Sequence, residues 1–176
     1  PSFGVAIISR MLEPQGYRVA ILPQPRFDTP EDMKRFGRPR LGFLVTGGNI
    51  DPMVAHYTAA RRLRSGDAYS PGNRAGLRPD RATIVYCRLI REAYGDVPIV
   101  IGGLEASLRR FAHYDYWDDA VRPSILLESG ADLLSFGMGE HSITEIAARM
   151  AAGEHPAAMH DIRGTCYLCG LEEPLS

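Results

Sequence analysis

One short stretch of this sequence gathers many of the side chains that could do chemistry. Residues 102–117, GGLEASLRRFAHYDYW, follow the apolar run VPIVI and crowd carboxylate, guanidinium, imidazole and indole groups together. A loop that only turns the chain needs Gly, Pro, Asn or Asp. We therefore expect this stretch to bind a ligand or a partner. Its candidate residues are Gly102, Gly103, Glu105, Ser107, Arg109, Arg110, His113, Asp115 and Trp117.

Two residues of this stretch, His113 and Asp115, could form a proton-transfer pair beside an aromatic wall. Their closeness in sequence does not orient the two side chains toward each other, and no nucleophilic Ser or Cys is tied to them. Recognition of a ligand or docking of a domain is therefore favoured over catalysis.

Two further turns combine glycine with polar side chains after an apolar run. Their candidate residues are Thr46, Gly47, Gly48, Asn49 and Asp51 in TGGNIDPM, and Gly137, Gly139 and Glu140 in FGMGEHS. Asp51 precedes Pro52 and is equally an ordinary helix cap. In the second turn Ser142 stands where a dinucleotide fingerprint has its third glycine, so that signal is weak. Either these glycines only make the turn, or the N–H groups at 140–142 bind an anion.

An arginine-rich insertion between the first two turns raises the alternative of nucleic-acid binding. It carries Arg61, Arg62, Arg64, Arg74, Arg78 and Arg81 with Tyr57 and Tyr69 interleaved. Arginines and aromatic rings can track a phosphate backbone and stack on bases, but a solvated, salt-bridged face has the same composition. The net charge of −1 and an isoelectric point near 6.6 argue against a protein built mainly to bind nucleic acid.

The pattern of apolar residues predicts the fold that positions these side chains. Strands are predicted at 17–22, 41–46, 97–101 and 131–136, with GTCYLCG (164–170) as a candidate edge strand, and helices at 3–13, 29–36, 52–63, 80–95 and 140–153. Thr29 and Asp80 are the predicted caps of two of these helices. Strands that are apolar on both faces and alternate with helices indicate an α/β fold with a doubly wound, mostly parallel sheet of the Rossmann or flavodoxin type. All three glycine turns then lie at the carboxyl edge of the sheet, where such folds bind ligands.

Composition and length indicate a single globular domain that spans 1–176. Hydrophobic residues make up 45% of the chain and charged residues 23%. No apolar run approaches the roughly 20 residues of a membrane helix and no signal pattern is present, so we expect a cytoplasmic protein with no membrane partner. An odd number of cysteines, three, agrees with a reducing compartment. Cys166 and Cys169 would point to opposite faces of a strand, which disfavours a zinc site.

The chain opens without Met, and its first periodic segment is a helix rather than a strand. We therefore expect a fragment of a longer protein that lacks its first strand.

Several long stretches resemble the N-terminal domain of the YgiQ-type radical-SAM proteins. The most specific are EASLRRFAHYDYW (105–117) and DAYSPGNRAGLRPDRA (67–82), and the resemblance spans nearly the whole chain. It implies a Rossmann module of the cobalamin-binding type, followed by a radical-SAM barrel of the same chain. In that barrel a Cys-x-x-x-Cys-x-x-Cys motif holds a [4Fe–4S] cluster, which cleaves S-adenosylmethionine by one-electron reduction.

The resemblance therefore implies an accessory or binding role for this domain in an enzyme of unknown substrate, and no catalysis by the fragment alone. Cys166 and Cys169 match neither the spacing nor the position of the cluster cysteines. Cobalamin is allowed as a ligand, and the turns at 47–49, 102–105 and 137–140 would surround it, although the Asp-x-His-x-x-Gly motif is absent. Alternatively, the arginine and aromatic loops hold a substrate or the barrel. The resemblance also implies a strand before Pro1, without which 17–22 and 41–46 would flank a gap.

Overall fold

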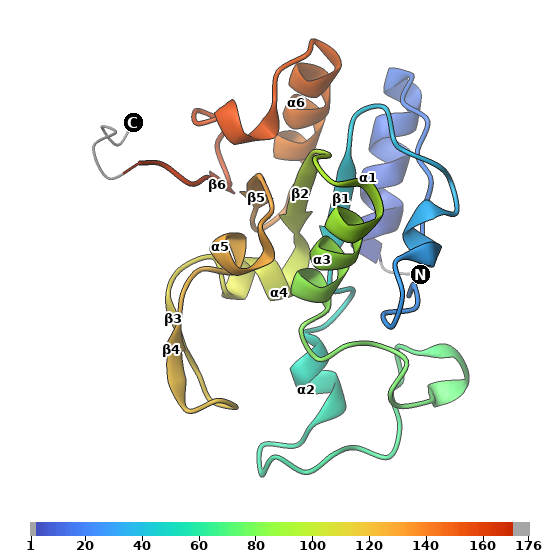
Figure 1. Cartoon of the computed structure of the whole chain (residues 1–176), viewed down its shortest axis with the longest axis vertical. Coiled ribbons are helices and arrows are strands. Elements are labelled where there is room, and N and C mark those ends of the chain that lie inside the picture. Colours follow the sequence, from blue (N-terminus) through green and yellow to red (C-terminus); the bar gives the residue numbers. More distant parts are fainter. Residues whose placement is uncertain (1–2, 171–176) are drawn as a thin grey trace.

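A mostly parallel sheet lies at the centre of the structure, a computed structural model that describes residues 3–170 (Figure 1). Its strands, in spatial order within that range, are β1 (Phe43–Thr46), β2 (Ile99–Gly102), β5 (Leu133–Ser135) and β6 (Thr165–Cys166). β1, β2 and β5 run parallel, and β6 runs antiparallel to β5 at one edge. The predicted α/β class and the predicted edge strand are confirmed.

Helices cover both faces of this sheet. They are α1 (Phe3–Leu12), α3 (Ala82–Tyr94), α5 (Ile125–Ser129) and α6 (Glu140–Ala151). Because successive side chains of a strand point to opposite faces, Ile99 and Ile101 pack toward α3 and α5, whereas Val100 packs toward α1 and α6. In the same way, Leu134 of β5 packs on the face covered by α3 and α5, and Leu133 packs on the face covered by α1 and α6. Burial on both faces explains why these strands are continuous apolar runs.

A hairpin that was not predicted from the sequence projects away from the sheet beside α5 and the short helix α4 (Gly103–Leu108) (Figure 1). The smaller elements are α2 (Pro52–His56), α4 (Gly103–Leu108), the hairpin strands β3 (His113–Asp115) and β4 (Ala120–Arg122), and 3₁₀ turns at Glu13–Gln15, Glu31–Lys34, Pro71–Asn73 and Pro156–Ala158. The two hairpin strands are antiparallel and only three residues long. They are too short and too polar to show the alternation by which a strand is recognised in sequence.

The strand predicted at 17–22 is wrong, because this segment pairs with no strand in the described part of the chain. Its apolar side chains still contribute to the cores, Tyr17 and Val19 on one face of the sheet and Leu22 on the other. The helix predicted at 29–36 is only the 3₁₀ turn Glu31–Lys34, and Pro30 rather than Thr29 occupies its cap position.

The helix predicted at 52–63 ends at His56, because the chain becomes extended at Tyr57 and pairs back on itself at Leu63. Asp80 does not cap α3, for which Arg81 takes the cap position. The Asp80 carboxylate instead accepts a hydrogen bond from the Tyr57 hydroxyl at 2.8 Å and lies 2.7 Å from Nδ1 of His56. It thereby fastens the start of the insertion to the start of α3.

Candidate functional site

The three glycine turns meet at the carboxyl edge of the sheet. A Cβ at Gly103, which follows β2, would overlap Oγ1 of Thr46 at the end of β1, so the two turns are in direct contact. The third turn is tied to α4 by a hydrogen bond of 3.2 Å from the Gly137 amide to Oγ of Ser107. Gly103 and Gly137 have positive φ angles, +81° and +72°, which glycine adopts at little cost. Sequence reasoning thus placed these turns correctly relative to one another.

Glu105 anchors the floor of this edge and does not face solvent. It is 2% exposed, and its Oε2 accepts hydrogen bonds from the backbone N–H and the hydroxyl of Thr83, at 3.0 and 2.7 Å. Burial raises the pKa of Glu105 above its ordinary value, although the bonds from Thr83 oppose this shift. Because its carboxyl group also packs against Gly47, Glu105 joins α4, α3 and the first turn.

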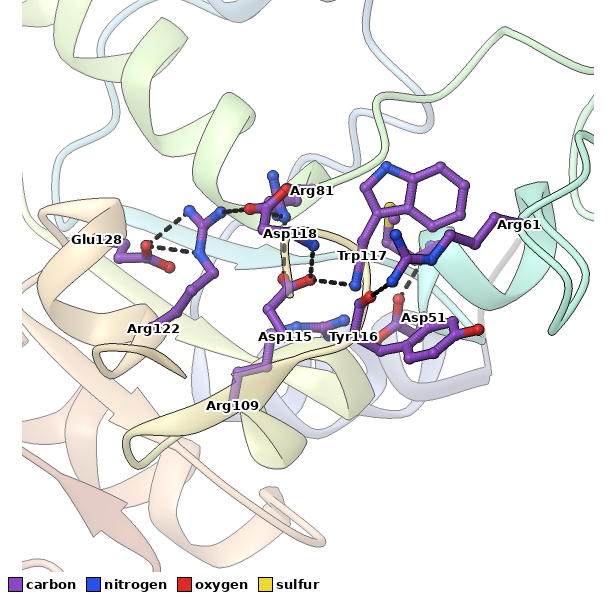
Figure 2. A network of polar contacts seen from close by, with 11 residues as sticks. Asp51, Arg61, Arg81, Arg109, Asp115, Tyr116, Trp117, Asp118, Arg122 and Glu128 are labelled. Atoms are coloured by element: carbon purple, nitrogen blue, oxygen red, sulfur yellow. Dashed lines mark hydrogen bonds and ion pairs between the residues drawn. The ribbon is translucent and has the colours of Figure 1, made fainter. Parts of the chain in front are cut away.

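Asp51 and Arg109 form an ion pair across the edge, one from the first turn and one from the end of α4 (Figure 2). The other carboxylate oxygen of Asp51 accepts from the Met53 amide at 2.9 Å and caps α2. Asp51 is therefore the helix cap expected from the sequence. Its carboxylate is also paired with Arg109 of the same domain.

Asp115 organises the β3–β4 hairpin. Its Oδ1 accepts from the backbone amides of Trp117 and Asp118, at 2.8 and 3.1 Å, and its Oδ2 accepts from Arg81 at 2.9 Å. Burial raises the pKa of Asp115, but the hydrogen bonds from Arg81 and from the amides outweigh burial and leave it below its ordinary value.

The network continues from Arg81 to the other side of the hairpin, as Figure 2 shows. Arg81 also bonds Asp118 at 2.7 Å, and Arg122 joins Asp118 to Glu128 of α5. Most charged residues near the hairpin therefore bind one another and fix it to α3 and α5. Asp118, Arg122 and Glu128 were absent from the predicted set, and Arg81 was predicted only as one of the arginines of the insertion, since nothing in the sequence indicates which carboxylate each guanidinium meets.

The proton-transfer pair of His113 and Asp115, which the sequence disfavoured, does not form within the described residues. His113 and Asp115 share no hydrogen bond, and Nδ1 of His113 lies 3.1 Å from the carbonyl oxygen of Phe111. The Nε2 atom of His113 is buried without a partner in the same range. Arg110 donates to the Ser107 carbonyl at 2.6 Å and lies over the rings of Phe111 and Phe136. His113 and Arg110 therefore make contacts within the protein where the hairpin begins.

The arginines of the insertion are mostly engaged within the protein. Arg78 forms a buried pair with Asp67, at 2.8 and 2.9 Å, and Arg64 donates to the Tyr57 carbonyl at 3.1 Å. Burial raises the pKa of Asp67, but hydrogen bonds from Arg78, Ser70 and the Tyr69 amide outweigh it and lower the pKa to about 2.

The guanidinium of Arg61 lies 4.5 Å from the centre of the Tyr116 ring and bonds the carbonyl oxygen of that residue. The Trp117 ring packs on Tyr57, with ring centres 4.1 Å apart. These contacts join the insertion to the hairpin and match the salt-bridged alternative better than an open basic groove.

The third turn is exposed at Gly137 and Met138. Gly139 occupies the cap position of α6, and no side chain caps that helix. Ser142 is buried and its hydroxyl lies 2.7 Å from that of Ser135, so it binds the end of β5 rather than solvent. Glu140 begins α6 at this edge, and Asn49 is exposed on the first turn. Anion binding at the start of α6 stays a prediction.

The comparison with known families decides what kind of domain this is. The family model described as Radical SAM N-terminal matches residues 1–174. The chain belongs to this family. A UPF0313 protein of Clostridium perfringens (strain SM101 / Type A) is 61% identical over 167 residues, which cover 95% of this chain and 25% of that protein. A UPF0313 protein of Geobacter sulfurreducens is 59% identical over 170 residues, or 97% of this chain and 28% of that protein.

The radical SAM N-terminal domain described here thus spans about a quarter of the length of the curated relatives it matches. A UPF0313 protein of Methanocella arvoryzae is 59% identical over 167 residues, which cover 28% of its length. No solved structure matches this chain.

The cysteines of this domain do not form a metal centre. Within residues 3–170 no group of three or more His, Cys, Asp or Glu side chains is arranged to hold a metal ion. Cys87 is buried in the core, where burial raises the pKa of its thiol to about 12, whereas Cys169 is exposed and Cys166 lies in β6. These residues therefore do not fit a [4Fe–4S] cluster.

Within residues 3–170, no helix is long and apolar enough to cross a membrane.

Proposed function

We propose that this domain is the N-terminal binding part of a longer radical-SAM iron–sulfur enzyme of unknown substrate. In this proposal the [4Fe–4S] cluster and S-adenosylmethionine are held by a barrel outside these 176 residues, and the carboxyl edge of the sheet presents the substrate to it. Membership of the radical SAM N-terminal family and the greater length of the relatives support this division of labour.

The positions of the thiols favour a cluster outside this domain. Iron–sulfur clusters are bound by Cys thiolates. Cys87 is 0% exposed in the core, and its raised pKa opposes the thiolate form that iron requires. Cys166 and Cys169 are too few for the three-cysteine motif that the family resemblance implies. All three thiols are free, which suits the cytoplasm, where we place the protein.

The observation that carries the substrate-binding role is the convergence of three turns at one edge. Ligands of open α/β sheets bind outside the carboxyl ends of the strands. Here that edge is fixed from below by Glu105 and the Asp51–Arg109 pair, while Asn49 and Gly137 remain exposed. A rigid floor with exposed backbone above it is suited to hold a polar substrate.

Cobalamin is a poor fit to the same edge. The open side of Gly47 is filled by the Glu105 carboxyl group, and that of Gly103 is filled by Thr46. The space that these two glycines leave free of a Cβ is thus occupied by side chains of the domain itself rather than offered to a corrin ring. We expect hydroxocobalamin added to the full-length protein to be removed by desalting, and a bound corrin absorption spectrum would overturn this part of the proposal.

The decisive experiment replaces the thiols of this domain in the full-length protein. The variant Cys87→Ala, Cys166→Ser, Cys169→Ser is purified without oxygen beside the wild type. We expect both to hold the same iron and sulfide and, after reduction, to release 5′-deoxyadenosine from S-adenosylmethionine. A variant that loses its iron would place the cluster on this domain, and a wild-type protein without iron or cleavage would overturn the enzyme assignment.

A further inference from the structure

The β3–β4 hairpin has its polar face turned inward and its apolar face turned outward. Tyr114 and Val121 are directly opposite each other on the two strands and therefore share one face, where they are 59% and 76% exposed. The neighbouring residues Asp115 and Arg122 point to the other face and bind Arg81 and Glu128. A ribbon that faces water normally has the opposite arrangement, with its polar side chains outward.

The apolar exposure continues onto the elements beside the hairpin. The residues that complete it are Leu104 and Leu108 of α4, Phe111, and Met138 of the third turn. The Ser107–Gly137 hydrogen bond holds α4 and the third turn side by side. Met138 is 89% exposed, at the edge where the glycine turns meet. We call these residues, with Tyr114 and Val121, the apolar face.

The hairpin that carries the apolar face is rigidly attached. Asp115, Asp118 and Arg122 bind Arg81 at the start of α3 and Glu128 in α5 (Figure 2). The exposed side chains thus project from a fixed element rather than from a loose loop. Exposed apolar side chains gathered on adjacent elements in this way mark an interaction surface.

We infer that the apolar face is the docking surface for the remainder of the longer chain, the part to which the proposed function assigns the cluster. The relatives that match this domain are about four times its length, so each has a large additional segment to cover such a face. The hairpin stands beside the carboxyl edge of the sheet (Figure 1). A partner that covers the hairpin therefore also faces the edge proposed to hold the substrate.

The test measures the accessibility of one position on this face in the full-length protein. Val121→Cys adds a thiol at an exposed site, and Asp96→Cys is the matched control in the turn before β2, at the amino edge of the sheet. Both variants are treated with a maleimide at a concentration where light scattering shows a monomer, and labelling is read peptide by peptide by mass spectrometry. We expect labelling at 121 to be at least about tenfold slower than at 96, because a covered thiol reacts only when the interface opens.

Equal labelling rates in the monomer would overturn the inference. Protection at 121 that appears only when the protein dimerises would overturn it too, because a second copy of the chain would then be the partner. The inference rests on the proposed function, but the two can fail separately. Protection at 121 in a protein that holds no iron would retain the docking surface and reject the enzyme, whereas iron binding with free labelling would do the reverse.

Discussion

The carboxyl group of Glu105 fills the space beside Gly47 that the Cβ of any other residue would need. This contact joins the turn after β1 to helix α4, and Thr83 holds the same carboxyl group from the start of α3. Three elements that come from different parts of the chain therefore meet on one side chain at the carboxyl edge. The side chains beneath this edge are tightly packed, and their packing depends on the absence of a Cβ at Gly47.

Substitution of Gly47 by Ala should destabilise the domain by about 1–3 kcal/mol, because the added methyl group overlaps a buried side chain. The free energy of unfolding can be measured in urea through the fluorescence of Trp117, the only tryptophan of the chain. In a Glu105→Ala background the closest overlap, with the carboxyl group, is removed, and the same substitution should add less than about 0.5 kcal/mol. Equal costs in both backgrounds would contradict the packing described here.

The stability of Glu105→Gln relative to the wild type should increase progressively as the pH rises above about 4.5. The carboxyl group ionises near that pH in the unfolded chain, whereas burial raises the pKa of Glu105 in the folded state. The folded state then holds more protons than the unfolded state, so the wild type loses stability with rising pH until the folded pKa is passed. Glutamine does not titrate. Urea titrations of both proteins from pH 4 to pH 8 test this, and a constant difference would contradict it.

Arg78→Ala should cost about 3–5 kcal/mol, because it leaves the carboxylate of Asp67 buried without its partner. Arg62→Ala is the control, since that side chain is exposed and its loss should change stability by less than about 0.5 kcal/mol. The pKa of Asp67 is lowered from 3.8 to about 2. The hydrogen bonds to the charged Asp67 carboxylate therefore stabilise the fold fully above pH 3.8. This stabilisation is lost as the pH falls toward 2. Similar losses in the two variants would refute this assignment.

The insertion should not bind RNA through its arginines. Arg61, Arg64, Arg78 and Arg81 are engaged by groups of the protein itself. Binding through phosphates would fall steeply with salt, roughly in proportion to the number of phosphates neutralised. Fluorescence anisotropy with a labelled single-stranded RNA should show no such affinity at low salt. Strong binding at low salt that is lost in the Arg61→Ala, Arg62→Ala variant would revive the nucleic-acid alternative.

Strands buried on both faces were predictable because their side chains have only apolar surroundings, as in 99–102. The run at 17–22 has the same composition, but an apolar run does not specify which strand it pairs with, and this one pairs with no strand of residues 3–170. The hairpin was not predictable, since it is held by ion pairs between residues far apart in the sequence, such as Asp115 with Arg81. For the same reason, charged residues that looked like recognition groups in sequence proved to bind one another.

In our proposal the carboxyl edge of this domain faces the cluster-bearing part of the protein. A nitroxide attached to Asn49→Cys lies at that edge, and one attached to Asp96→Cys lies at the amino edge as the control. Reduction of the cluster makes it paramagnetic and speeds the relaxation of a nearby spin. In the full-length protein we predict a marked increase in the relaxation rate at position 49 and a much smaller one at position 96. Equal responses, or a larger one at 96, would contradict a carboxyl edge that faces the cluster.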